Sequence, residues 1–156
     1  MCSSDLCKRK VWSTEINPIA HAIAGAAVAD NTSLDKLRLC ELTAIDAMTK
    51  GMGTPHDWRW IADVLNIAET MAKHGIGLEV LPYCENAQKA LLEAKERYDK
   101  TGKMGLSGTG IKVIKELWEY HDLQRTSVAR SEYERMIQKT MNNIRSHGKE
   151  IGRAHV

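Results

Sequence analysis

The side chains that could do acid–base or metal chemistry are scattered along this chain of 156 residues. Outside the extreme C-terminus no two histidines stand three or four residues apart, the helical spacing that would place both rings on one metal ion. These histidines are His21, His56, His74, His121 and His147. His121-Asp122 could orient an imidazole for proton transfer, but a buried, hydrogen-bonded structural histidine is the commoner arrangement. We therefore expect no catalytic residue, no metal site and no cofactor.

The cysteines do not form a site either. The chain has four cysteines, of which Cys2 lies in an N-terminal segment that looks foreign. The other three, Cys7, Cys40 and Cys84, lack the CxxC spacing of zinc sites, and their odd number gives no disulfide framework, which favours a reducing compartment. We expect each of them to behave as a small apolar residue. No glutamate precedes a histidine by three residues, so the sequence does not support a di-iron bundle.

Residues 102–110, with the sequence GKMGLSGTG, are rich in glycine. Successive backbone N–H groups in such a stretch could hold a phosphate at the start of a helix. A P-loop, however, follows a strand and ends in Gly-Lys-Ser/Thr, and a dinucleotide site requires a βαβ unit. Neither context is present, so we interpret this stretch as an ordinary flexible connection between helices.

Two tryptophans flank an arginine in the segment TPHDWRW at 54–60. Trp58, Arg59 and Trp60 could form an exposed anchor for a partner, because aromatic and arginine side chains dominate binding hot spots. The other interpretation is a core tryptophan next to a helix start. It is favoured because a chain without phenylalanine must fill its core with Trp, Met and Leu.

Positive charge is gathered at the two ends of the chain. Residues 8–10 carry three positive charges, residues 11–122 a net charge of −4, and residues 123–149 a net charge of +4. Such ends could grip a polyanion, lie on an acidic body, or simply form a solvated helix face. The candidate contact residues are Lys8, Arg9, Lys10, Arg125, Arg130, Arg135, Lys139 and Arg145.

The elements that position these residues all have helical periodicity. Asn17-Pro18 predicts the start of an alanine-rich, buried helix over 19–29. A second helix is expected from Thr32 or Ser33 to Lys50-Gly51. Thr54 caps a third, which runs to about Lys73 and ends at Gly75. Its broad apolar surface predicts a central helix with neighbours on at least two sides.

Two further helical stretches follow. After a short approach segment at 78–81, the pattern predicts a helix from about Pro82 to Thr101 that stops at Gly102. Residues 111–146 contain no Gly or Pro, which permits one long helix or two. We favour a joint at 127–131, where Ser131 and Glu134 have a capping-box spacing. Beyond it, an apolar stripe continues out of phase with the preceding one: Tyr133, Ile137, Thr140 and Ile144.

Both termini have sequences that look foreign. MCSSDL at 1–6 and EIGRAHV at 150–156 correspond to translations of the two strands of one common sequencing adapter. We interpret both as adapter-derived and expect the native part to be a single helical domain over residues 7–149. Within it, residues 123–149 form the basic C-terminal segment.

Composition limits the class of protein. The chain is 43% hydrophobic and 27% charged, which is typical of a globular domain and excludes a disordered chain. No run approaches the ~20 apolar residues of a membrane-spanning helix. We therefore predict an all-α fold, a compact bundle of about five or six helices from which a basic C-terminal helix could project, and a cytoplasmic location.

Two segments resemble known proteins: VWSTEINP at 11–18 and HDLQRTSVARSEYER at 121–135. They are similar to parts of small uncharacterised proteins from phages and prophage regions of proteobacteria, and the similarity extends over most of residues 10–145. The resemblance implies a bacterial cytoplasm and an accessory role in a mobile element. It implies no catalytic or binding residue.

The leading hypothesis is a non-enzymatic helical adaptor or regulatory protein that contacts a protein partner through its basic C-terminal helix. Self-association is expected because the out-of-phase stripe would need a second surface to cover it. The alternative is a nucleic-acid-binding protein that places the same arginines on phosphates. An enzyme would require His121, Asp122 or His56 to meet a partner that spacing alone does not show.

Overall fold

The computed structural model describes residues 31–155, and their side chains from residue 33 to residue 146. The predicted helix at 19–29, Lys8, Arg9 and Lys10 lie outside the described residues. The described chain is helical apart from its connections and one isolated β-bridge, which confirms the predicted all-α bundle. Its helices are α3 (Asn31–Thr49), α4 (Pro55–Lys73), the 3₁₀ helix η1 (Leu78–Val80), α5 (Leu81–Thr101), α6 (Gly108–Thr126) and α7 (Arg130–His155).

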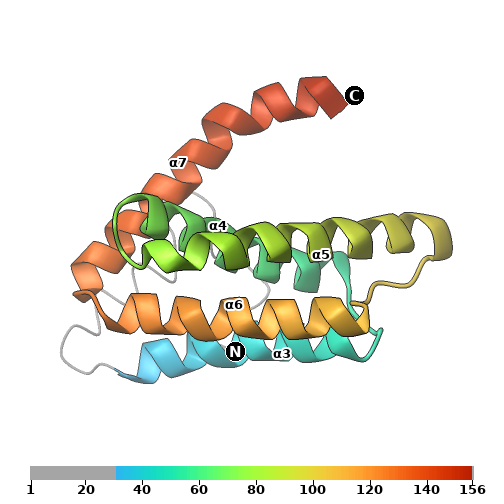
Figure 1. Ribbon diagram of the computed structural model, residues 1–156, viewed down its shortest axis with the longest axis horizontal. Helices are drawn as coiled ribbons and strands as arrows, with labels where there is room; N and C mark the ends of the chain where they lie inside the picture. Colours follow the sequence, from blue (N-terminus) through green and yellow to red (C-terminus); the bar gives the residue numbers. More distant parts are fainter. Residues whose placement is uncertain (1–30, 156) are drawn as a thin grey trace.

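Four of these helices form a bundle with short connections, so that helices adjacent in the sequence run antiparallel. Figure 1 shows α3 and α6 along one side of the bundle and α4 and α5 along the other. Helix α7 crosses the end of the bundle, packs against α4 and then extends away from the body. None of the described helices is long and apolar enough to cross a membrane.

The helix ends follow the local signals in the sequence. At the start of α4, Thr54 Oγ1 accepts a hydrogen bond from Asp57 N at 3.2 Å, and the Asp57 carboxylate accepts from Thr54 N at 2.9 Å. Gly51, Gly75 and Gly102 follow α3, α4 and α5 with φ between +72° and +87°, a conformation that costs glycine little. The predicted boundaries of these three helices are therefore confirmed.

The joint between the last two helices is also confirmed. Helix α6 ends at Thr126 and α7 begins at Arg130. The predicted cap at Ser131 is wrong, because Ser131 already lies inside the first turn of α7. Backbone bonds from Glu132 N and Tyr133 N to the carbonyl oxygen of Ala129 begin the helix two residues earlier.

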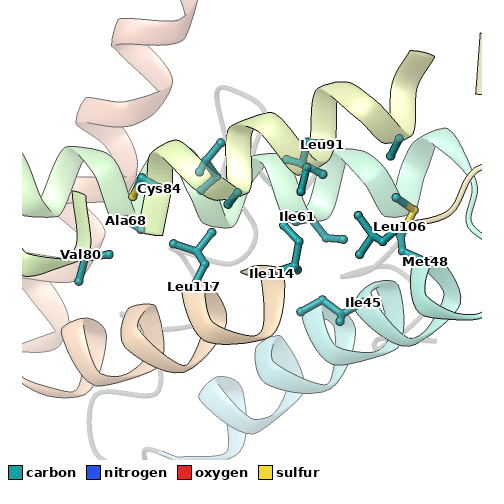
Figure 2. Close-up of a cluster of buried hydrophobic side chains, with 14 of the residues drawn as sticks. Ile45, Met48, Ile61, Ala68, Val80, Cys84, Leu91, Leu106, Ile114 and Leu117 are labelled. Atoms are coloured by element: carbon teal, nitrogen blue, oxygen red, sulfur yellow. The ribbon is translucent and has the colours of Figure 1, made fainter. Parts of the chain in front are cut away.

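Two clusters of buried apolar residues hold the helices together. The larger lies inside the four-helix bundle, where Ile45, Ile61, Leu91 and Ile114 each come from a different helix (Figure 2). The smaller lies among α3, α4 and α7. Helix α4 contributes to both clusters, which confirms that it is central. The smaller cluster consists of Leu37, Cys40, Ala44, Trp60, Ile67, Met71, Tyr133, Met136 and Ile137.

The glycine-rich stretch connects α5 to α6, as predicted, and backbone hydrogen bonds fix its path. Gly53 N donates to Met104 O at 3.0 Å, and Leu106 N donates to Met48 O at 3.0 Å. These bonds join the loop to the last turn of α3 and to the turn that follows it. The two loops approach so closely that a Cβ on Gly105 would lie 2.8 Å from the Cα of Gly51.

Candidate functional site

A bidentate ion pair is buried between α3 and α6. Arg125, in the last turn of α6, donates from Nη2 to Oε1 of Glu41 at 2.8 Å and from Nη1 to Oε2 at 2.9 Å. Both side chains are only 1% exposed. Removing two charges from water costs several kcal/mol per ion, so a buried pair is tolerated only where other polar groups satisfy its remaining donors and acceptors.

Trp118 and Asp122 supply those groups from the same side of α6. Trp118 Nε1 donates to Oε1 of Glu41 at 2.8 Å, and the Arg125 guanidinium lies 5.9 Å from the centre of the Trp118 ring. Arg125 Nε donates to Oδ1 of Asp122 at 2.8 Å. Burial alone would lower the pKa of Arg125, but the charges and hydrogen bonds of Glu41 and Tyr133 together outweigh burial and raise this pKa well above its ordinary value.

Asp122 extends the network toward the surface. It accepts from Arg38 of α3 at both oxygens, from Nε at 2.9 Å and from Nη2 at 3.0 Å. Burial alone would raise the pKa of Asp122, but the hydrogen bond from Arg38 and the charge of Arg125 outweigh burial, and the pKa is lowered. Helices α3 and α6 are thus joined by two ion pairs.

A second chain of hydrogen bonds runs through His121, which is fully buried. Gln124 Nε2 donates to the carbonyl oxygens of Ile76 at 2.8 Å and Ala68 at 3.2 Å, and these bonds fix the orientation of its amide. The amide oxygen therefore faces His121 Nδ1, at 3.1 Å, and this nitrogen must carry the proton. His121 Nε2 then accepts from the Tyr133 hydroxyl, at 3.1 Å.

Tyr133 joins the two chains and connects both to α7. Arg125 Nη1 lies 3.5 Å from the Tyr133 hydroxyl. Burial, and then the charge of Arg125, lowers the pKa of His121 to about 4. Burial raises the pKa of Tyr133 to about 12. Both groups are therefore neutral near pH 7. We call this assembly the buried polar cluster; it comprises Arg38, Glu41, Trp118, His121, Asp122, Gln124, Arg125 and Tyr133.

The buried polar cluster does not have the geometry of an acid–base site. His121 and Asp122 are adjacent in sequence but bond to different partners, and His121 has no exposed surface. Two hollows on the described surface lie elsewhere: one between the ends of α5 and α6, and one between α3 and α6 that borders only Trp118 of the cluster. His56 is exposed on α4, where its Nε2 accepts from Trp60 Nε1 at 3.2 Å. In the described part, these three groups do not share a cleft.

Sequence reasoning missed Glu41, Arg38 and Gln124, although a signal was present for two of them. Glu41 follows Leu37 by four residues and so lies on the apolar face of α3. Gln124 follows His121 by three on the buried face of α6. A charged or amide group at a buried helical position indicates a polar partner inside the protein. Arg38 is half-exposed and gave no such signal.

The predicted contact residues separate into buried and exposed groups. The prediction that Arg125 lies on an outward basic surface is wrong, because α6 turns this side chain into the protein. Arg130 is half-buried at the first residue of α7. Arg135 is exposed and pairs with Glu132 at 2.6 Å. Lys139 and Arg145 are exposed, and neither has an ion pair within the described part.

The tryptophan segment is not an exposed anchor. Trp60 is 3% exposed and belongs to the smaller apolar cluster. Trp58 is half-buried, and its Nε1 donates to the carbonyl oxygen of Leu91 at 2.9 Å. Only Arg59 is exposed. The structure thus favours the core interpretation of this segment.

Helix α7 has an inner and an outer face. Tyr133, Ile137 and Thr140 are buried, so the expectation that this stripe needs a second surface is wrong for three of its four members. Only Ile144, at 41%, is exposed. The outer face is polar and basic. Figure 1 shows the second half of α7 extending away from the bundle. We define the α7 outer face as the exposed residues Arg135, Gln138, Lys139, Asn142 and Arg145.

Comparison of the chain with family models, curated proteins and solved structures gives no match. The resemblance to phage and prophage proteins therefore stays a prediction, as does the cytoplasmic location. The expectation that the cysteines are unpaired is wrong for Cys40, which is disulfide-bonded, whereas Cys84 is free and buried. Function has to be inferred from the residues of the chain itself.

Proposed function

We propose that the protein is a non-enzymatic helical binding protein that contacts an anionic macromolecule through the α7 outer face. The observation that carries this proposal is the distribution of charge on α7. Residues 135–149 contain four basic residues and no Asp or Glu. Exposed cations on a helix that extends from the body can reach a partner without rearrangement of the bundle.

Burial within the chain supports an anionic partner over an apolar one. The aromatic residues that could anchor a protein partner, Trp58 and Trp60, are engaged in the bundle. The apolar side of α7 is covered up to Thr140. What α7 offers to another molecule is therefore positive charge and amide groups, which attract polyanions through contacts that weaken with salt.

The absence of catalysis is part of the same proposal. The groups whose pKa values depart furthest from their ordinary values within the cluster are His121, Tyr133 and Arg125. Such shifts mark functional sites only when the groups lie in a cleft. Here all three side chains bond to one another or to other buried groups.

Retention on two polyanions tests the proposal. The full chain should bind both a heparin column and a poly-glutamate column at low salt. The variant Lys139→Ala/Arg145→Ala should elute at clearly lower salt. The control Lys100→Ala/Lys103→Ala removes the same charge from exposed residues in the last turn of α5 and the loop after it, at the end of the bundle away from the α6–α7 joint. This control should elute like the wild type. Failure of the wild-type chain to bind either column at low salt would overturn the proposal.

A further inference from the structure

The α7 outer face has an internal order that its net charge does not reveal. With 3.6 residues per turn, each residue advances about 100° around the helix. Lys139 precedes Asn142 by three residues and Arg145 follows it by three, so the two cations lie about 60° to either side of Asn142. Gln138 lies about 40° from Asn142 on the side of Arg145, and Arg135, seven residues before Asn142, lies about 20° from it on the side of Lys139. The two amides therefore form a central row between two basic flanks, with Arg135 and Lys139 on one side and Arg145 on the other.

The amides of the central row are also arranged as a pair. Gln138 Nε2 donates to Asn142 Oδ1 at 3.3 Å, and both residues are exposed. This bond aligns the two side chains along the helix and leaves the Asn142 nitrogen and the Gln138 oxygen with capacity for other partners. Asn and Gln side chains are the usual partners of the adenine edge in the major groove.

We infer that the anionic partner is double-stranded DNA and that the outer face of α7 over residues 135–145 lies in the major groove. This inference rests on the proposed function. A helix with its side chains is about 10–12 Å across, and the major groove of B-DNA is about 12 Å wide. A helix in that groove has base edges in front of it and a phosphate backbone on each side. Amides between two basic flanks match this order of base edges and phosphates.

The same residues argue against other nucleic acids. Single-stranded binding relies on aromatic side chains on which bases stack. Residues 135–149 contain no Phe, Trp or Tyr, and Tyr133 is buried. The major groove of duplex RNA is too narrow and deep for a helix to read. Duplex DNA is the nucleic acid that fits both the shape and the chemistry of the α7 outer face.

Fluorescence anisotropy on the full chain tests the inference. Labelled probes of one sequence would be a 20-base-pair DNA duplex, its single strand and the RNA duplex, each titrated at several salt concentrations. We expect the DNA duplex to bind about tenfold tighter than the other two. Lys139→Ala/Arg145→Ala should reduce the slope of log K against log salt by about 2, since each phosphate contact contributes about 0.9. Lys100→Ala/Lys103→Ala should leave the slope unchanged.

A second variant tests the central row. Gln138→Ala/Asn142→Ala removes the amides and no charge, so it should keep the wild-type salt slope. In selection from a randomised duplex pool, the wild-type chain should enrich particular bases, and this variant should lose the enrichment. A wild-type chain without base preference, or a variant that keeps the preference, would overturn the position of the amides against base edges. Circular dichroism melting curves verify that each variant is folded.

The outcomes separate this inference from the proposed function. If the single strand or the RNA duplex binds as tightly as the DNA duplex, the duplex DNA inference fails. The proposed function still stands in that case, provided that Lys139→Ala/Arg145→Ala weakens retention on heparin and poly-glutamate. If the chain binds no probe and neither column at low salt, both fail.

Discussion

At the scale of single residues, the ion pair between Glu41 and Arg125 makes stability depend on both partners. Arg125→Ala leaves a carboxylate that is 1% exposed without its counter-charge, and we expect the free energy of unfolding to fall by about 3–5 kcal/mol. Glu41→Leu/Arg125→Met removes both charges and keeps apolar volume, so it should recover most of the loss. Urea denaturation at pH 7 measures both.

Arg135→Ala is the matched control for this experiment, since it breaks an ion pair of which one member is 71% exposed. An exposed pair contributes less than about 1 kcal/mol. Equal losses for Arg125→Ala and Arg135→Ala would contradict the assignment of Arg125 to the buried cluster.

His121 gives stability a dependence on pH. Its pKa is about 4 in the folded protein, against 6.5 for an ordinary histidine, so between pH 6.5 and pH 4 the unfolded chain binds more protons. The contribution of His121 is therefore complete above pH 6.5 and is lost as the pH falls through this window, by about 3 kcal/mol in total. His121→Gln should flatten the rise of unfolding free energy between pH 4.5 and 6.5. A variant with the wild-type slope would contradict this assignment.

Asp63 on α4 acts in the opposite direction. Burial raises the pKa of this carboxyl to about 7, against the lowering effect of Arg59. The folded state therefore binds more protons than the unfolded state between pH 3.8 and pH 7, and stability falls as the pH rises through that window. Asp63→Asn should raise the free energy of unfolding at pH 8 by roughly 1–3 kcal/mol. At pH 4 the same substitution should leave the free energy of unfolding nearly unchanged. Thermal melting at the two pH values tests this sign.

At the scale of the elements, the contact between two loops holds one end of the bundle. Gly105→Ala would place a methyl group 2.8 Å from the Gly51 backbone, which has no flexible side chain to give way. We expect a loss of about 1–3 kcal/mol, as for other overpacked sites. Gly108→Ala is the control, because a Cβ there meets nothing within 4 Å in the first turn of α6. The control should be neutral or slightly stabilising in the same denaturation experiment.

Helix boundaries were predictable because caps and closing glycines act over three or four residues. Thr54 with Asp57, and the glycines after α3, α4 and α5, fix backbone geometry with no help from the rest of the fold. The predicted start of α7 was wrong because it also depended on a local signal alone. Ser131 and Glu134 have the right spacing for a cap, but the helix begins two residues earlier. In this arrangement Tyr133 bonds to His121 and Arg125, two contacts with another helix that local spacing does not show.

At the scale of the whole molecule, the charge of a segment did not predict where its charges point. Arg125 belongs to the basic C-terminal segment in the sequence, yet it lies in the last turn of α6, and its partner Glu41 is 84 residues away. Such a pairing depends on how α3 and α6 pack, which no local pattern encodes. The exposed cations of α7 were predictable because they lie opposite the apolar stripe of their own helix.

The division of α7 into a covered half and an extended half leads to a prediction for truncated chains. A chain ending at residue 129 loses the side chains that close the smaller apolar cluster, each worth about 1.5–3 kcal/mol of burial. It should unfold at much lower urea concentration and show fast amide exchange in α3 and α4. The lost side chains are Tyr133, Met136 and Ile137.

A chain ending at residue 141 keeps those side chains and the hydroxyl bond to His121. The described residues that it lacks are exposed, so its urea midpoint should stay close to that of the full chain. Its retention on heparin should nevertheless fall, because the cations Arg145 and Lys149 are gone. Hydrogen exchange in α3 and α4 and elution from heparin, measured on both truncated chains, test these two expectations. If the chain ending at residue 141 unfolds as easily as the chain ending at residue 129, the second half of α7 is part of the folded core and not a free surface for a partner.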